Sequence, residues 1–290
     1  MDIKLITDSA CDLPLNYIKD NNIEFLSLGV NLNNEYILDD LGDTLKYDYF
    51  YKELRDGKTA STSQVNIYAF EEVFEKYVKE GKSIIYIGLS SGLSGTINSA
   101  NIAKQNILEK YENADISIID SISASLGEGA LVYYACEMLK DGKDKYEVVN
   151  WLEENKGKIL HAFTVDDLSH LKRGGRISSA AATVGSLLNI KPILTINNEG
   201  KVVQAGKIKG RKKAIKYLGA QVKEKAFDIE NQVIFIAHAD CEKEANELKE
   251  IVLKENNIKK VILNSMGAVI GAHGGPGTLA VIFIGECRNS

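Results

Sequence analysis

The sequence predicts an α/β protein built in two parts, and the order of its apolar segments is the main reason. Up to about residue 155, short apolar runs alternate with amphipathic stretches, which is typical of strands joined by helices. After that point the pattern changes to a hairpin followed by a mixture of strands and helices. The chain has 290 residues, 44% hydrophobic and 26% charged, so it can bury the core of one large or two ordinary domains.

The first part predicts βαβ units and a largely parallel sheet with flanking helices. Apolar runs predict strands at residues 3–6, 23–30, 83–89 and 116–119. Helical spacing predicts helices at residues 68–79, 97–110 and around 128–140. Between the first two strands, Asp12 precedes Pro14, which suits a helix start because proline is tolerated in the first turn. We therefore place an N-terminal α/β domain at residues 1–155.

The second part predicts an α+β domain with a mixed sheet, at residues 156–290. Its first signal is a hairpin, in which strands at 193–196 and 201–205 flank the turn sequence N-N-E-G at 197–200. Further strands are expected at 233–237, 260–263 and 279–284, and helices at 180–188, 212–225 and 242–255. A glycine-rich segment at 267–277 precedes the last strand. No linker of low complexity marks the boundary near residue 155.

Composition excludes several classes of protein. A net charge of −5 argues against a nucleic-acid binder, which needs a basic surface. The N-terminus reads as a strand without a secretory signal, and no apolar run reaches the roughly 18 residues that span a bilayer. We therefore expect a cytoplasmic protein without stable membrane insertion. The cysteines are too far apart for a disulfide frame or a zinc site, so we expect no metal: Cys11, Cys136, Cys241 and Cys287.

The strongest local feature is the loop S-S-G-L-S-G-T at residues 90–96, between a predicted strand and a predicted helix. Glycines let the backbone approach a ligand closely, and free N–H groups at a helix start favour an anion. Ser94 and Thr96 would add hydroxyl donors. The alternative is a loop whose serines only cap the helix. The stretch by itself leaves both interpretations open.

The same stretch also matches G-x-S-x-G at residues 88–92, the signature of a serine esterase with Ser90 as nucleophile. Asp166 or Asp167 and His238 or His273 would complete the order Ser, Asp, His. However, a nucleophile elbow needs a helix directly after the serine, and Gly92 and Gly95 extend the loop instead. The esterase is therefore the alternative hypothesis.

A second hydroxyl cluster, T-A-S-T-S-Q at residues 59–64, precedes the predicted helix at 68–79. It is too polar for a strand, and we expect a helix N-cap region; the alternative is that this helix entry and the one at 90–96 converge on one anion. Two basic segments, at 172–178 and 207–213, suit either solvated helix starts or phosphate contacts. His273 lies among glycines at 271–277, where a ligand can reach its ring, although a lone histidine is often structural.

Taken together, these segments resemble the DegV family, to which the fatty-acid-binding subunits of bacterial fatty acid kinase belong. The resemblance covers nearly the whole chain, and the ordered set of motifs is specific although each motif alone is weak. The motifs are T-D-S at 7–9, T-S-Q at 62–64, L-S-S-G-L-S-G-T at 89–96, D-S at 120–121, L-K-R-G-G-R-I at 171–177 and G-A-H at 271–273.

The resemblance implies a two-domain fold that holds one long-chain fatty acid, such as palmitate, between the domains. It implies that Thr62 and Ser94 bind the carboxylate and that His273 lies close to this head group. It further implies a role in lipid transport or fatty acid metabolism, in which the chain is no enzyme by itself and has no cofactor or catalytic residue. The partner would be a separate ATP-dependent kinase that phosphorylates the carboxylate.

Two positions depart from the pattern of the family. Val65 follows T-S-Q where relatives often have proline, which should alter loop stiffness more than chemistry. Lys209 stands where many relatives carry an arginine tied to the kinase, so the charge is kept but bidentate geometry is lost. Fatty-acid binding is therefore better supported than coupling to a kinase.

Overall fold

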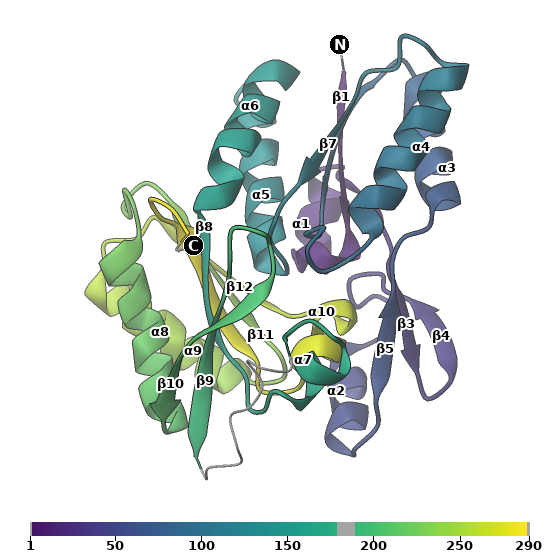
Figure 1. The fold of residues 1–290 in the computed structure, drawn as a ribbon. Coiled ribbons are helices and arrows are strands. Elements are labelled where there is room, and N and C mark those ends of the chain that lie inside the picture. Colours follow the sequence, from purple (N-terminus) through teal and green to yellow (C-terminus); the bar gives the residue numbers. More distant parts are fainter. Residues whose placement is uncertain (1, 179–188, 289–290) are drawn as a thin grey trace.

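The computed structural model describes residues 2–178 and 189–288 (Figure 1). Among these residues the strands form a four-stranded parallel sheet, a six-stranded mixed sheet and a three-stranded antiparallel sheet, called here the small sheet. The predicted fold class, with a parallel sheet in the N-terminal part and a mixed sheet in the C-terminal part, is confirmed. The helix predicted at 180–188 lies outside the described residues. No described helix has the length and apolar character needed to cross a bilayer.

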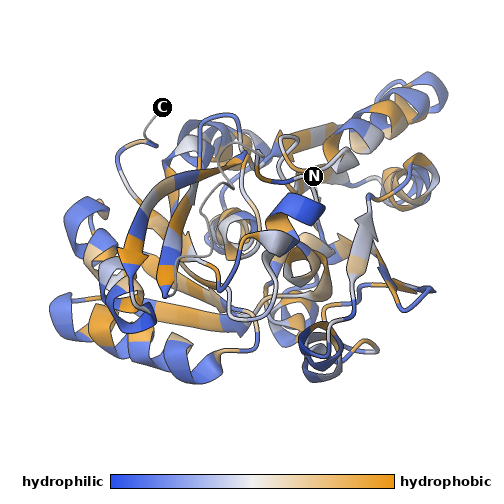
Figure 2. Ribbon diagram, turned by 60° about the horizontal axis from the view of Figure 1, so that its bottom comes forward, coloured by the Kyte–Doolittle hydropathy of each residue, from blue (hydrophilic) through white to orange (hydrophobic). Residues whose placement is uncertain are grey.

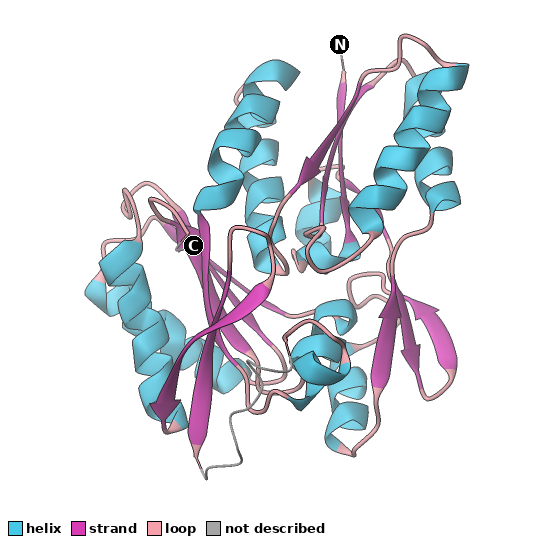
Figure 3. Ribbon diagram, viewed as in Figure 1, coloured by secondary structure: helices cyan, strands magenta, loops and turns pink. Residues whose placement is uncertain are grey.

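The parallel sheet is the core of the N-terminal part. The strand at residues 83–88 is buried at every position, because helices cover both faces of the sheet. In spatial order its strands are β2 (Glu24–Leu26), β1 (Ile3–Asp8), β6 (Ser83–Gly88) and β7 (Ile116–Asp120). Its helices are α1 (Leu15–Asp20), α3 (Ile67–Lys79), α4 (Thr96–Lys110), α5 (Leu126–Lys140) and α6 (Lys145–Asn155). Figure 3 shows the α3–α4 pair and the α5–α6 pair on opposite sides of this sheet.

The small sheet was not expected. It consists of β4 (Glu35–Leu38), β3 (Gly29–Leu32) and β5 (Ala60–Ser63), with α2 (Tyr47–Arg55) between β4 and β5. The single strand predicted at 23–30 is therefore wrong, because this segment divides between two sheets. At the division, the N–H of Leu28 donates to the Ser9 hydroxyl at 3.1 Å, and the carbonyl of Leu28 accepts from the N–H of Asp39 at 2.9 Å. Because of these two hydrogen bonds, Leu28 does not continue the pairing of β2 with β1 in the parallel sheet.

The expectation that residues 59–64 are too polar for a strand is also wrong. β5 pairs antiparallel with β3, and Thr62 lies opposite Val30. Strand propensity reflects how a residue fits a partly buried pleated surface rather than an intrinsic backbone preference. Here, pairing with the buried strand β3 decides the conformation, and the exposed polar side chains are those of Ser61 and Ser63.

The mixed sheet forms the C-terminal part. In spatial order its strands are β10 (Val202–Lys209), β9 (Ile190–Ile196), β8 (Ile159–Thr164), β13 (Leu279–Ile284), β11 (Val233–His238) and β12 (Lys260–Ser265). Its helices are α7 (Ser169–Arg173), α8 (Arg211–Lys225), α9 (Glu242–Glu255) and α10 (Ala268–Gly274). The predicted hairpin is confirmed as β9–β10, whose turn is closed by a bond from the N–H of Gly200 to the Asn197 carbonyl at 3.0 Å.

The two faces of the mixed sheet pack against different partners. Its outer face packs on α8 and α9 through residues such as Leu218, Leu248 and Val281. Its inner face joins the hydrophobic core of the N-terminal part through Phe163 and Ile282. Figure 2 shows hydrophobic strands beside helices whose outer surfaces are largely hydrophilic. The inner face therefore meets the other half of the chain.

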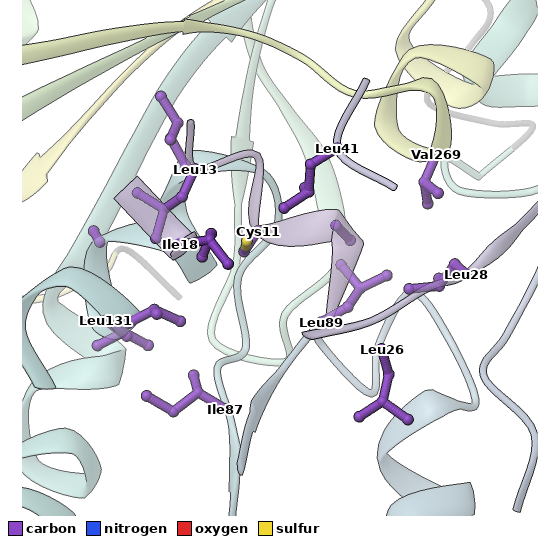
Figure 4. Close-up of a cluster of buried hydrophobic side chains, with 14 of the residues drawn as sticks. Cys11, Leu13, Ile18, Leu26, Leu28, Leu41, Ile87, Leu89, Leu131 and Val269 are labelled. Carbon is purple, nitrogen blue, oxygen red and sulfur yellow. The ribbon is translucent and has the colours of Figure 1, made fainter. Parts of the chain in front are cut away.

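Where the two parts meet, apolar side chains and hydrogen bonds join them. Val269 of α10 packs in one cluster with Leu28 and Leu89 from the N-terminal part (Figure 4). The Tyr51 hydroxyl donates to the Met266 carbonyl at 2.8 Å. The boundary proposed near residue 155 stays a prediction, because both parts contribute to one continuous core.

Candidate ligand-binding site

A cavity of about 380 Å³ lies between the inner face of the mixed sheet on one side and α10, β5 and the loop after β6 on the other. This volume is within the roughly 300–1,000 Å³ of ordinary ligand pockets. Most of its wall is apolar and comes from both parts of the chain. The apolar lining residues are Leu28, Leu89, Leu93, Ala124, Phe163, Leu171, Ile196, Val202, Met266, Val269, Ile270, Ala280 and Ile282.

The polar part of the wall brings together the residues that the sequence singled out. Thr62 is supplied by β5 and His273 by α10, and the Thr62 Oγ1 atom lies 2.8 Å from the Nε2 atom of His273. Ser94 comes from the loop between β6 and α4 and also lines the cavity. Three segments that are distant in sequence therefore meet at one cavity.

The two hydroxyl-rich loops pack directly against each other. A Cβ atom at Gly95 would overlap the side-chain oxygen of Gln64, so only glycine allows this approach. The amide nitrogen of Gln64 donates to the Ser99 hydroxyl at 2.8 Å, which ties the end of β5 to α4. Ser94 lies 2.9 Å from Thr96 through their hydroxyl oxygens. Both hydroxyls lie at the start of α4, where the free N–H groups of a helix stabilise an anion.

His273 is neutral near pH 7. Burial, and to a smaller extent the neighbouring charge of Arg176, lowers the pKa of its ring to about 4. A neutral imidazole has one donor and one acceptor nitrogen. If Nε2–H donates to Thr62, the hydroxyl proton of Thr62 is free to bond to an anion in the cavity. The site can therefore hold a carboxylate with neutral donors.

The lowered pKa makes protein stability depend on pH. On unfolding, the pKa of His273 returns from about 4 to its ordinary 6.5, so the unfolded chain binds more protons in this window. The stability that neutral His273 contributes is present above pH 6.5 and is lost as the pH falls from 6.5 through 4. We expect the His273→Gln variant to lose less stability over this window, by on the order of 1 kcal/mol.

The measurement is chemical denaturation of both proteins at pH 7 and pH 4.5. Other histidines with lowered pKa, such as His161, change stability in the same direction, so the quantity compared is the difference between the two proteins. Equal losses in the wild type and the variant would contradict the assignment to His273.

The structure does not assemble the esterase. The hydroxyl of Ser90 is buried and donates to the Gly200 carbonyl at 2.9 Å, so its proton is bound by backbone rather than by imidazole. Asp166 forms an ion pair with Lys191 at 2.7 Å. His238 lies in strand β11, paired with β12 and β13. The geometry of Ser90 therefore suits a structural role at the β9–β10 turn.

Arg176 lines the cavity beside His273. From the sequence, its segment suited either a solvated helix start or a contact with phosphate. Its guanidinium donates to the Leu93 carbonyl at 3.1 Å, which connects the segment after α7 to the loop that carries Ser94. The sequence signal for Arg176 was the G-G-R motif at residues 174–176. In the structure, Gly174 packs so closely on the His273 ring that a Cβ atom would overlap it. The apolar wall itself had no linear signal.

A polar groove of about 670 Å³ adjoins the cavity and shares Thr62, Arg176 and His273 with it. Its other lining residues are mostly polar or basic and include Asn31, Asn33, Asn34, Lys58, Thr59, Ser61, His170 and Arg173. The residues that meet at the cavity therefore also face this groove. Among the described residues, no cluster of three histidine, cysteine or acidic side chains is suited to hold a metal ion.

Comparisons with known proteins give one consistent result. A family model described as uncharacterised protein of the DegV family matches residues 2–286. A DegV domain-containing protein of Clostridium perfringens is 49% identical over 284 residues, which is 98% of each chain.

Solved structures agree with this result. A DegV-family protein from Thermus thermophilus, described by its fatty acid binding, is 31% identical with a TM-score of 0.89, covering 99% of this chain and 100% of that one. DegV of Bacillus subtilis, described as a fatty acid binding protein, is 33% identical with a TM-score of 0.85 at the same coverage. Since the family model spans nearly the full length, the chain belongs to the DegV family.

Proposed function

We propose that this protein binds one long-chain fatty acid, with the carboxylate at Thr62, Ser94 and His273 and the hydrocarbon tail in the apolar cavity. The observation that carries the proposal is the position of these three polar residues on a cavity whose remaining wall is mostly apolar. The fatty acid binding of the relatives from Thermus thermophilus and Bacillus subtilis supports it. A solved DegV-family structure from Ruminococcus gnavus is described with vaccenic acid, at 26% identity.

The energetics favour a long chain. A sixteen-carbon acid buries about 14 methylenes at about 0.8 kcal/mol each, which makes about 11 kcal/mol available. Ordering the tail and the loss of free motion offset several kcal/mol of this. The head group costs several more kcal/mol unless it is hydrogen-bonded. Charge-assisted bonds from Thr62 and Ser94, at about 1.5–3 kcal/mol each, offset that cost.

The test is native mass spectrometry of the protein as purified. We expect a one-to-one complex whose extra mass corresponds to a long-chain fatty acid and is released on denaturation. Delipidated protein should take up palmitate again at the same ratio. Delipidated, folded protein that fails to bind palmitate would overturn the proposal.

We propose further that the bound carboxylate is presented to a separate ATP-dependent kinase, which transfers a phosphoryl group to it and gives an acyl phosphate and ADP. The polar groove supports this step, because it shares Thr62, Arg176 and His273 with the cavity and so offers access to the head group. Exposed Lys209, at the end of β10, is the residue that we assign to docking.

Lys209 provides the test of the kinase step. With a cognate kinase, we expect Lys209→Ala to lower acyl phosphate formation about 10-fold, since a rim charge acts mainly on association, and Lys209→Arg to retain it. Palmitate binding should be equal in both variants because Lys209 does not line the cavity. Unchanged transfer by Lys209→Ala would exclude docking through this residue.

The esterase with Ser90 as nucleophile is the second candidate. A fluorophosphonate probe should leave Ser90 unlabelled, because the hydroxyl is buried and its proton is bound by the Gly200 carbonyl. Ser90→Ala should instead lower the free energy of unfolding by about 1–3 kcal/mol, since it removes a buried hydrogen bond. Covalent labelling of Ser90, identified by peptide mass spectrometry, would favour the esterase.

A further inference from the structure

The residues assigned to the carboxylate come from both parts of the chain. Thr62 and Ser94 belong to the N-terminal part, whereas His273 is carried by α10 of the C-terminal part. The 2.8 Å contact between the Thr62 Oγ1 atom and the Nε2 atom of His273 therefore exists only while α10 packs against the N-terminal part. The bonds that hold α10 in this place decide the geometry of the head-group site.

Asp12 holds the start of α10 from the N-terminal part. It is 2% exposed, and its Oδ1 atom accepts a hydrogen bond at 2.8 Å from the N–H of Gly267, the residue that precedes α10. A Cβ atom at Gly267 would lie 2.8 Å from this oxygen, closer than side chains pack, so glycine is what allows the bond. The carbonyl of Asp12 accepts a second bond at 2.8 Å from the side-chain amide of Asn264 on β12. Both bonds connect the two parts of the chain.

The other carboxylate oxygen of Asp12 accepts from the hydroxyl of Ser125, which lines the cavity. Ser125 precedes α5, but its hydroxyl does not cap that helix. Its backbone has a φ of 56° and a ψ of −143°, a conformation that is strained for a residue other than glycine. The bond to Asp12 thus replaces an ordinary helix cap and coincides with a strained backbone. Departures of this kind from local preference are typical of functional sites.

A second buried carboxylate, that of Asp39, lies near the same helix start. A Cβ atom at Gly267 would lie 3.2 Å from its Oδ2 atom. Its Oδ1 atom accepts from the N–H of Leu41 at 3.2 Å and from the Tyr47 hydroxyl at 3.3 Å, both within the N-terminal part. Carboxylates are favourable at the N-terminus of a helix. Asp12 therefore makes the better hydrogen bond to the start of α10, and Asp39 adds a second carboxylate close to it.

The bond between Asp12 and the start of α10 lies in a dry part of the molecule. Figure 4 shows Leu13 and Leu41 in the buried apolar cluster that also contains Val269 of α10. Where water is excluded a hydrogen bond is stronger, and its loss leaves the donor without a partner. Removal of the Asp12 carboxylate would leave two buried donors without an acceptor. We therefore expect the start of α10 to shift, and His273 to shift with it.

We propose that Asp12 is a positioning residue of the head-group site. Through Gly267 it holds α10 where His273 meets Thr62, and through Ser125 it fixes the start of α10 relative to the wall of the cavity. The inference rests on the proposed function, since it assigns what orders the carboxylate site for the same ligand. Asp12 does not line the cavity, so its effect on binding passes through these neighbours. The effect should fall mainly on the carboxylate, because the tail binds to the apolar wall.

The experiment compares the affinities of delipidated protein for palmitate and for hexadecanol, which has the same tail and no carboxylate. We expect Asp12→Gly to lower the preference for palmitate about 10-fold and to change the affinity for hexadecanol little. Glycine suits the φ of 52° at this position, so this variant loses the carboxylate and keeps the backbone conformation. Asp12→Asn should retain most of the preference, because its amide oxygen can still accept from Gly267. An unchanged preference in folded Asp12→Gly overturns the inference.

The matched control is Arg55→Ala, which removes another link between the two parts, the ion pair with Asp240 at 2.5 Å. It should keep the preference of the wild type, and an equal loss there would contradict a specific role of Asp12. If Asp12→Gly fails to fold, Gly267→Ala decides, since the added methyl group separates the helix start from Asp12 and should lower the preference in the same way. A wild-type preference in Gly267→Ala would then overturn the inference. Folded wild-type protein that does not bind palmitate overturns the proposed function instead.

Discussion

We expect the replacement of Thr62 with valine and of Ser94 with alanine to remove bound fatty acid from the purified protein and to leave the fold intact. Each hydroxyl is expected to contribute about 1.5–3 kcal/mol to the affinity, since a carboxylate deprived of a donor in a dry cavity keeps its full desolvation cost. We expect each single variant to bind palmitate about 10- to 100-fold more weakly. The double variant should retain no lipid through purification.

Valine suits this experiment because it preserves the shape of threonine on the strand. The control is Ser61→Ala, the preceding residue of β5, which lines the polar groove but not the cavity. Affinity for palmitate is measured by isothermal titration, and thermal unfolding tests the fold. Native lipid content in the double variant would show that neither hydroxyl binds the head group.

Filling the cavity at Ala280 has the other large expected effect. Ala280 is buried on β13, lines the cavity and pairs with Phe163 on β8. A leucine or phenylalanine side chain there occupies space that the tail needs. Excluding about five methylenes forfeits about 4 kcal/mol, which corresponds to roughly a 1,000-fold loss of affinity for palmitate. The loss should be larger for Ala280→Phe than for Ala280→Leu.

A short acid distinguishes this effect from damage to the head-group site. Octanoate does not need the whole cavity, so its weak affinity should change far less than that of palmitate. Overpacking costs about 1–3 kcal/mol of stability, and thermal unfolding of both variants measures it. Palmitate affinity that is unchanged in folded Ala280→Phe would place the tail outside this cavity.

The sequence determined the elements whose signal is local. Apolar runs placed β1, β6 and β7, and the turn at residues 197–200 predicted the β9–β10 hairpin, because a buried parallel strand and a tight turn each require specific residues at adjacent positions. The ordered motifs predicted the DegV family, which the family model confirms. The assignment of Thr62, Ser94 and His273 to the head group came from this resemblance, and it stays a prediction.

Only the tertiary structure decided what these residues do together. Residues 60–63 form a strand because they pair with β3. The segment at 23–30 divides between two sheets because Leu28 forms hydrogen bonds with Ser9 and Asp39 instead of continuing the parallel sheet. The cavity wall combines side chains from both halves of the chain, and no linear pattern encodes which apolar residues leave a space between them.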